Sequence, residues 1–299
     1  MPQSEQNTAV QPAEEEKGPF VRNLLEFWKS FRKNKPAIVG AVIVLFFILM
    51  AAFAGFIAPQ GINDQNINIR LQPPSASHWL GTDDFGRDIL SRIIYGSRLS
   101  LRVGFFAVIG SIIVGTLLGV AAGYFGKFID TVISRFFDIL LAFPSILLSI
   151  AIVAVLGPSL NNALVAIAIV NVPVFGRLVR ARVLTVKEEE YIMAARSIGM
   201  GNTRIIFNHI LPNSFAPIIV QGTLNIATAI LDAAGLGFLG MGAQPPQPEW
   251  GTMLSSSRQY ITNAPWTVLF PGLAIILVVV GFNLMGDGLR DALDPRMKN

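Results

Sequence analysis

The sequence contains no cysteine and few charged side chains. Its 299 residues include only two histidines and 14% Asp, Glu, Lys and Arg, whereas 52% are hydrophobic. The lack of cysteine excludes disulfides and thiolate metal sites, and His78 and His209 lie too far apart in sequence to suggest a metal cluster. Soluble domains carry about 25% charged residues, so this composition predicts a membrane protein.

The sequence also lacks the motifs that bind nucleotide phosphates or perform hydrolysis. Gly126-Lys127 is followed by Phe128, and Ala121 stands where a Walker A loop needs glycine. No GxSxG or HExxH sequence occurs. We therefore expect no catalytic residue, metal or cofactor in this chain. Energy for active transport would have to come from a partner or from an ion gradient.

Long apolar runs predict an all-α polytopic membrane protein with six transmembrane helices. The first two runs hold no charge over 23 residues, enough to cross a hydrocarbon core of roughly 30 Å. The fourth is the weakest, because it contains Asn171 and Pro173. The expected spans are residues 36–58, 103–125, 139–156, 161–176, 214–243 and 266–286.

The distribution of lysine and arginine predicts how these spans are oriented. With the N-terminus in the cytoplasm, 17 of the 23 basic residues fall in inside segments and 6 in outside segments. The positive-inside rule then places both termini in the cytoplasm. We accordingly expect a multi-pass protein of the bacterial plasma (inner) membrane, with residues 59–97 as an extracytoplasmic loop.

The two terminal segments are polar, and neither resembles a transmembrane span. Residues 1–18 and 288–299 predict cytoplasmic tails, the first of them disordered. Residues 19–34 place apolar side chains at helical spacing opposite basic ones, which predicts an amphipathic helix at the membrane interface. The alternative is a loose basic segment held at the membrane by its charges.

The longest polar interval between two spans, residues 187–212, predicts two short helices with a hinge. Residues 188–198 contain no Gly or Pro, Gly199 can leave the helix through positive φ, and Asn202 can cap a second helix over 203–211. Pro212 is expected to end that helix or to kink it. Small side chains at Ala194 and Ala195 would let another protein approach closely.

This interval resembles the "EAA" loop of ABC-importer permeases, which couples the permease to its ATPase. The matching residues are Ala194-Ala195, Gly199 after three further residues, and Ile210-Leu211-Pro212. Met193 stands where the family pattern usually has Glu. The resemblance implies an ATPase-coupling surface made by Glu190, Met193, Ala194, Ala195, Gly199, Arg204, Leu211 and Pro212. Without it, the interval would be an ordinary amphipathic cytoplasmic loop.

A second stretch, residues 81–92, has the form GTDxxGRDxxSR, which resembles the C-type subunits of dipeptide and oligopeptide importers. Its aspartates at 83, 84 and 88 first suggest a metal site. Asp and Gly clusters usually mark turns, so we expect a turn capped by Asp83 or Asp84, mutual Asp–Arg pairing and an interfacial helix near 88–95. The tail that begins at Gly286, GDGLRDALDPR, matches the same branch.

Two further features of the spans concern helix contacts and the transport path. Gly115, Gly119 and Gly123 recur every four residues, which predicts a close helix–helix contact. Asp232 and Asn225 lie within the fifth span and are candidate pore residues, because a charge there should face the bundle interior or water. Alternatively, Asp232 accepts hydrogen bonds from a neighbouring helix.

The resemblance covers most of the chain after residue 20 and implies a type I ABC importer permease, with residues 98–287 as its permease domain. It also implies a second permease subunit, two ABC ATPase subunits that hold ATP and Mg, an extracytoplasmic substrate-binding protein and di- or oligopeptide cargo. Nickel, glutathione and cell-wall peptides remain open as cargo. From other classes, an ion-driven secondary transporter and a membrane enzyme remain, although no repeat and no catalytic set is seen.

Overall fold

The structure is a computed structural model that describes residues 27–293. The expected tail 1–18, most of the expected helix 19–34 and the end of the tail 288–299 therefore lie outside the described residues. Residues 27–33 are helical. The remaining helices are α2 (Lys35–Ala52), α3 (Ala54–Ile57), η1 (Ile67–Ile69), α4 (Ile89–Phe125), α5 (Lys127–Leu141), α6 (Ser145–Leu156), α7 (Leu160–Val186), α8 (Glu190–Ser197), α9 (Asn202–Ile205), the π-helix η2 (Ile206–Ile210), α10 (Leu211–Phe238), α11 (Trp250–Ser257), η3 (Arg258–Tyr260) and α12 (Trp266–Leu293).

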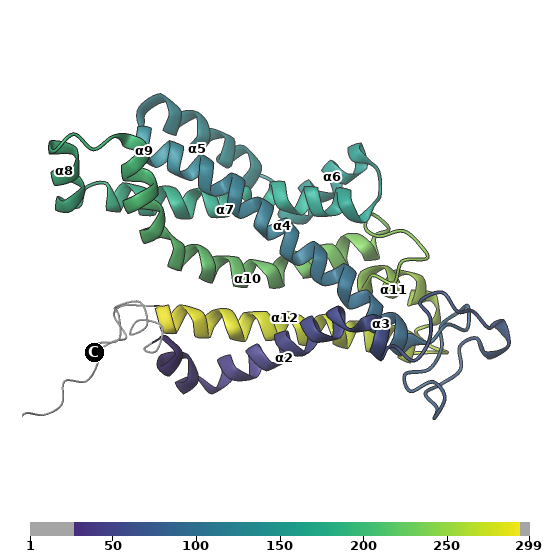
Figure 1. Cartoon of the computed structure of the whole chain (residues 1–299). Helices are drawn as coiled ribbons and strands as arrows, with labels where there is room; N and C mark the ends of the chain where they lie inside the picture. Colours follow the sequence, from purple (N-terminus) through teal and green to yellow (C-terminus); the bar gives the residue numbers. More distant parts are fainter. Residues whose placement is uncertain (1–26, 294–299) are drawn as a thin grey trace, which may run out of the picture.

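Long helices run between two ends of an all-α bundle, as the sequence predicts (Figure 1). At one end, α8 and α9 project beyond the bundle; we call it the coupling-loop end. At the other end lies the irregular segment 59–88, which we call the cap. Within residues 27–293, five helices are long and apolar enough to cross a membrane, and α5 with α6 makes a sixth span if the bent pair is counted as one.

The third span is broken, which the expected span 139–156 does not describe. Helix α5 ends at Leu141, α6 begins at Ser145, and the two helices are bent by 93°. Pro144 immediately precedes α6 and cannot continue the hydrogen bonding of α5. Two ion pairs attach α5 to α7: Arg180 donates to Asp130 at 2.7 Å, and Arg177 donates to Asp138 at 2.6 Å.

Other span boundaries differ from the expected ones because several helices run past their apolar segments. Helix α7 continues beyond residue 176 to Val186, and α12 continues beyond 286 to Leu293. The first span stops earlier: α2 ends at Ala52, and Phe53 separates it from the short α3. Arg98 of α4 donates to the carbonyls of Ala51 and Ala52 and so satisfies backbone acceptors at this break.

The turn that leads into α4 is capped by Asp83, as expected, because its carboxylate accepts from the backbone amides of Phe85 and Arg87 at 2.9 Å. Helix α4 begins at Ile89 and runs unbroken for 37 residues, so residues 89–95 form no separate interfacial helix. Asp88 caps this helix by accepting a hydrogen bond from the Ser91 amide at 2.8 Å.

The second half of the coupling loop also differs from the expectation. Gly201, not Asn202, occupies the N-cap of α9, and no helix ends at Leu211. The chain continues from α9 through η2 into α10, and the Leu211 amide bonds to the Ile206 carbonyl in the wider π pattern. This widened turn directly precedes Pro212, which sits in the first turn of α10, where its missing N–H costs least.

The glycines of α4 bring this helix into close contact with α7. A Cβ atom on Gly119 would lie 2.5 Å from the Gly176 carbonyl oxygen, and one on Gly115 would lie 2.8 Å from the Phe175 Cβ. A Cβ on Gly123 would lie 2.8 Å from the Val183 Cβ. Only glycine fits at these three positions, so the predicted helix contact is confirmed.

Candidate functional site

The loop 187–212 is a folded unit attached to the end of α7. Helix α8 turns at Gly199, whose φ of 82° lies in the left-handed region that favours glycine. The amide of Met200 bonds to the Ala195 carbonyl at 3.0 Å and closes this turn. The predicted helix–glycine–helix arrangement is therefore present.

Buried aliphatic side chains hold the loop in place. Ile192 of α8 is buried in one cluster with Ile205 and Ile210 from the second half of the loop and with Val179, Val183 and Val186 of α7. Polar contacts add to it: Tyr124 of α4 donates to Asn202 at 2.7 Å, and Asn213 donates to the Tyr191 hydroxyl at 3.2 Å. Motion of the loop would consequently be transmitted to α7 and α10.

The opposite side of the loop is exposed and partly apolar. Ile198 is 81% exposed, Phe207 62% and Met193 50%, and Glu190 and Ala194 are also exposed. Arg204 and Phe207 line a cavity of about 620 Å³ together with Gly201, Thr203 and Asn208. Apolar side chains on a polar loop outside the spans favour a protein partner over water.

Of the residues proposed for coupling, only some reach this exposed surface. Ala195 is buried, Leu211 is half-buried and Pro212 lies at the base of α10. These three shape the loop, whereas Glu190, Met193, Ala194 and Arg204 present side chains outward. Sequence reasoning did not single out Ile198 and Phe207, although both lie in the polar interval as isolated large apolar residues.

The candidate pore residues lie on α10 in different surroundings. Asn225 is buried; it donates to the Asn171 side chain at 3.3 Å and accepts from Gln221 at 3.2 Å. Asp232 is half-buried, and no described residue donates a hydrogen bond to its carboxylate. The Asn171–Asn225 contact joins α7 to α10 across 54 residues of sequence.

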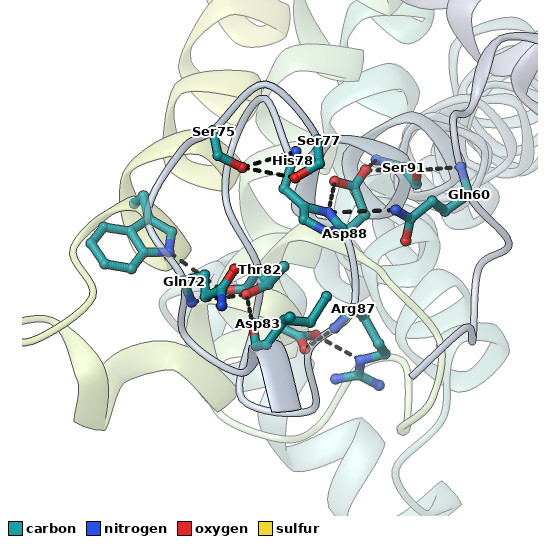
Figure 2. Close-up of polar contacts among 12 residues, drawn as sticks. Gln60, Gln72, Ser75, Ser77, His78, Thr82, Asp83, Arg87, Asp88 and Ser91 are labelled. Carbon is teal, nitrogen blue, oxygen red and sulfur yellow. Dashed lines mark hydrogen bonds and ion pairs between the residues drawn. The ribbon is translucent and has the colours of Figure 1, made fainter. Parts of the chain in front are cut away.

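At the opposite end, the cap folds around a buried polar network (Figure 2). Asp83 accepts from the Arg87 guanidinium at 2.6 Å and from the backbone amides of Phe85 and Arg87 at 2.9 Å, while Arg92 lies 3.5 Å away. The expected Asp–Arg pairing is thus confirmed. No group of carboxylate and imidazole side chains suited to a metal ion occurs within residues 27–293.

Hydrogen bonds also connect the cap to the two helices beneath it. Asp88 caps α4 and lies 3.1 Å from His78 Nδ1, and the Gln60 amide donates to Ser91 at 3.0 Å. Trp266, the first residue of α12, donates from its indole to the Thr82 carbonyl at 3.3 Å. The motif GTDxxGRDxxSR therefore fixes the start of α4 and the start of α12 relative to one another.

A buried glutamate organises the neighbouring helix α11. Glu249 is 1% exposed and caps this helix by accepting from the amides of Gly251 and Thr252, each at 2.9 Å. Ser100 of α4 also donates to it at 3.3 Å. Burial raises the pKa of Glu249, and these hydrogen bonds oppose that rise.

Comparison with solved structures first defines the class of protein. A structure described as "Inward facing conformations of the MetNI methionine ABC transporter" superposes with a TM-score of 0.54 at 18% identity. The superposition covers 68% of this chain and 96% of that chain. The fold is thus that of an ABC importer permease of type I.

Sequence comparison then identifies the family. Residues 115–299 match the family "Binding-protein-dependent transport system inner membrane component", and residues 24–74 match the "N-terminal TM domain of oligopeptide transport permease C". The chain belongs to the family of binding-protein-dependent inner-membrane permeases. It is accordingly a multi-pass protein of the inner membrane. The residues matched by the first family model, 115–299, differ from the expected permease domain at 98–287.

Curated relatives cover almost the full length of the chain. The "Dipeptide transport system permease protein DppC" of Alkalihalophilus pseudofirmus is 64% identical over 100% of this chain and 94% of the relative. The "Di/tripeptide transport system permease protein DppC" of Pseudomonas aeruginosa is 52% identical over 92% and 93%. The "Glutathione transport system permease protein GsiD" of Pectobacterium atrosepticum is 46% identical over 92% and 91%.

Proposed function

We propose that this chain is one permease subunit of an ATP-driven importer of dipeptides and short oligopeptides. The observation that carries this proposal is the 64% identity over the whole chain to a dipeptide permease. A second permease would complete the translocation path. A binding protein would deliver the peptide, and two ATPase subunits would supply ATP and Mg, so the chain itself would catalyse nothing.

The exposed side of the loop 187–212 is the proposed contact with an ATPase subunit. Its apolar residues Ile198, Phe207 and Met193 would be buried there, and Arg204 and Glu190 would add polar contacts. Because the loop shares a core with α7, closure of the ATPase pair would move α7 and α10 as well. The permease would alternate between an inward-facing and an outward-facing state. ATP drives this change only if the ATPase binds ATP more tightly in one of the two states.

This mechanism needs the coupling loop in the cytoplasm and the cap outside. Single cysteines at Glu189 and Gln247, introduced into this cysteine-free chain, test that orientation in intact cells. An impermeant thiol reagent should label the Gln247→Cys variant and spare the Glu189→Cys variant. The reverse labelling pattern would overturn both the orientation and the coupling proposal.

The function itself is tested with the complete complex in proteoliposomes. With its partner permease, ATPase subunits and binding protein, the chain should support ATP-dependent uptake of labelled Ala-Ala. The purified chain alone should hydrolyse no ATP. Uptake driven by an ion gradient without ATP, or ATP turnover by the chain alone, would contradict the proposal.

Glutathione is the second candidate cargo, because a glutathione permease is 46% identical over most of the chain. Uptake of labelled glutathione and Ala-Ala by the same complex distinguishes the two. We expect Ala-Ala to be transported faster at equal concentration. Transport of glutathione alone would leave the permease function intact and would replace the cargo.

A further inference from the structure

One face of α10 has no neighbour within the described residues. The helix lies between α7 and α12 (Figure 1) and also packs against α4, α6 and α11 on its other sides. Asn225 meets Asn171 of α7, Leu224 lies against Gly286 of α12, and Ile230 lies against Gly104 of α4. The remaining side, which carries the exposed residues Thr228 and Leu231, we call the open face.

A large cavity occupies the part of the open face nearest the coupling loop. Its volume is about 670 Å³, enough for a small ligand. Helix α10 supplies most of the wall at helical spacing, from Pro212 to Leu224, and α7 and α12 supply the sides. Arg182 of α7 and Arg290 of α12 both line the cavity and are exposed. Among the described residues neither arginine pairs with a carboxylate.

Polar side chains continue from this cavity along α10 towards the cap end. Gln221, Asn225, Thr228 and Asp232 follow one another at i, i+4, i+7 and i+11, so they form a single stripe along the helix. The stripe spans about 17 Å, since an α-helix rises 1.5 Å per residue. Gln221 lines the cavity, and Asp232 ends the stripe in the half of the span nearest the cap.

The surroundings of Asp232 indicate water at this face rather than lipid. Its carboxylate is half-buried, and no described residue donates a hydrogen bond to it. An unpaired carboxylate on a lipid-facing helix surface would be unfavourable by several kcal/mol. Exposed Thr228 lies one turn away on the same stripe. Both groups are therefore expected to border a hydrated path.

We propose that the open face of α10 is a wall of the peptide path, and that the peptide moves along it with its carboxylate leading. This inference rests on the proposed function. Asp232 would attract the amino terminus at the cap end of the path. Arg182 and Arg290 would attract the carboxylate at the coupling-loop end. A zwitterionic peptide fits this order of charges, and half-buried Gln221 and exposed Thr228 can bond to its backbone.

Thiol modification in the assembled complex tests whether the path is hydrated and charged. Thr228→Cys places a thiol on the open face, and Ile219→Cys is its matched control. Ile219 is 51% exposed in this chain. It lies nine residues, or two and a half helical turns, before Thr228, so its side chain is on the opposite side of α10. Each variant is treated with a trimethylammonium-ethyl and a sulfonato-ethyl methanethiosulfonate, and rates are expressed relative to those of free 2-mercaptoethanol.

The position on the open face should react, and the control position should not. At Thr228→Cys the cationic reagent should be favoured over the anionic one by roughly tenfold, because Asp232 lies one turn away and acts on the two charges in opposite senses. Adding Asp232→Asn should bring that ratio close to one. Equal, slow reaction of both cysteine variants would mean that lipid or the second permease covers the open face, and would overturn the proposal.

Transport measurements test the direction of the peptide. With one unchanged binding protein, uptake of a dipeptide is compared with uptake of its carboxy-terminal amide. Replacing both Arg182 and Arg290 by Gln should reduce the preference for the free carboxylate by roughly fivefold. An unchanged preference would overturn the carboxylate-first path. If the unaltered complex takes up no peptide at all, the proposed function fails instead.

Discussion

The cap end and the coupling-loop end of this bundle differ in where their side chains find partners. In the cap, Asp83, Arg87 and Asp88 are buried and paired with groups of the same chain. On the coupling loop, Ile198 and Phe207 are large, apolar and exposed. The cap pairs its buried charges internally and fixes the starts of α4 and α12, although Ile67 and Trp79 on its surface are exposed. The coupling loop is folded but presents a surface that only another protein would cover.

Loss of the central carboxylate of the cap should have the largest effect on folding. Asp83→Ala leaves Arg87 and Arg92 buried without their main partner, at a cost of about 3–5 kcal/mol. The Tm of the detergent-solubilised protein should fall by on the order of 10 °C. Asp64→Ala is the control, because Asp64 is exposed and accepts only from the Gly61 amide within the cap. Equal Tm values for the two variants would mean that the cap does not act as a frame.

In the middle of the bundle, an added methyl group on α4 should lower stability at Gly119 but not at Gly110. Gly119→Ala puts Cβ 2.5 Å from a backbone carbonyl of α7, so we expect a loss of about 1–3 kcal/mol. Gly110→Ala on the same helix is the control, since its Cβ would lie 3.6 Å from the Ala168 Cβ. Thermal unfolding should separate the two. A stable Gly119→Ala variant would show that α4 and α7 can move apart freely.

At the coupling loop, backbone strain should reduce coupling more than it reduces folding. Gly199→Ala forces alanine to φ 82°, with a local cost of roughly 1–2 kcal/mol. Gly201→Ala adds the same methyl group in equally open space at φ −67°. Uptake per ATP hydrolysed should fall only in the first variant, whose Tm should drop by no more than about 5 °C. Normal uptake in Gly199→Ala would remove the loop from the coupling mechanism.

Substitution of an exposed isoleucine at either end should have the smallest effect on stability, but the two substitutions should differ clearly in their effect on ATPase binding. Ile198→Ser and Ile261→Ser each change an exposed residue, 81% and 58% respectively, so each should alter stability by less than about 0.5 kcal/mol. Binding of the ATPase should weaken roughly tenfold for Ile198→Ser alone. Pull-down of ATPase subunits measures this. Equal binding by both variants would place the contact elsewhere.

The sequence allowed prediction of those features that depend on local chemistry. Apolar runs located the spans, the four-residue glycine repeat located the α4–α7 contact, and Gly199 located the turn of the coupling loop. Pro212 was expected to end or kink the second helix of the coupling loop. Instead it lies in the first turn of α10, directly after the π-helix η2, where a proline costs little.

Features that depend on distant residues could not be predicted. Asn171 and Asn225 lie 54 residues apart and meet only because α7 packs on α10. The break between α5 and α6 could be anticipated from Pro144, but neither its 93° bend nor the ion pairs that join α5 to α7 could be. The cavity with Arg182 and Arg290 likewise needs three helices to be placed together.

Hydrogen exchange of the permease pair, measured with and without its ATPase subunits and in the absence of binding protein, tests the contrast between the two ends most directly. Amides of residues 190–208 should become protected when the ATPase binds, because the exposed side of the coupling loop is then covered. Amides of residues 81–83 and 85–87 should already be protected and should not change, since each donates a hydrogen bond within the cap. Rapid exchange in the cap, or an unchanged coupling loop, would contradict this division of roles.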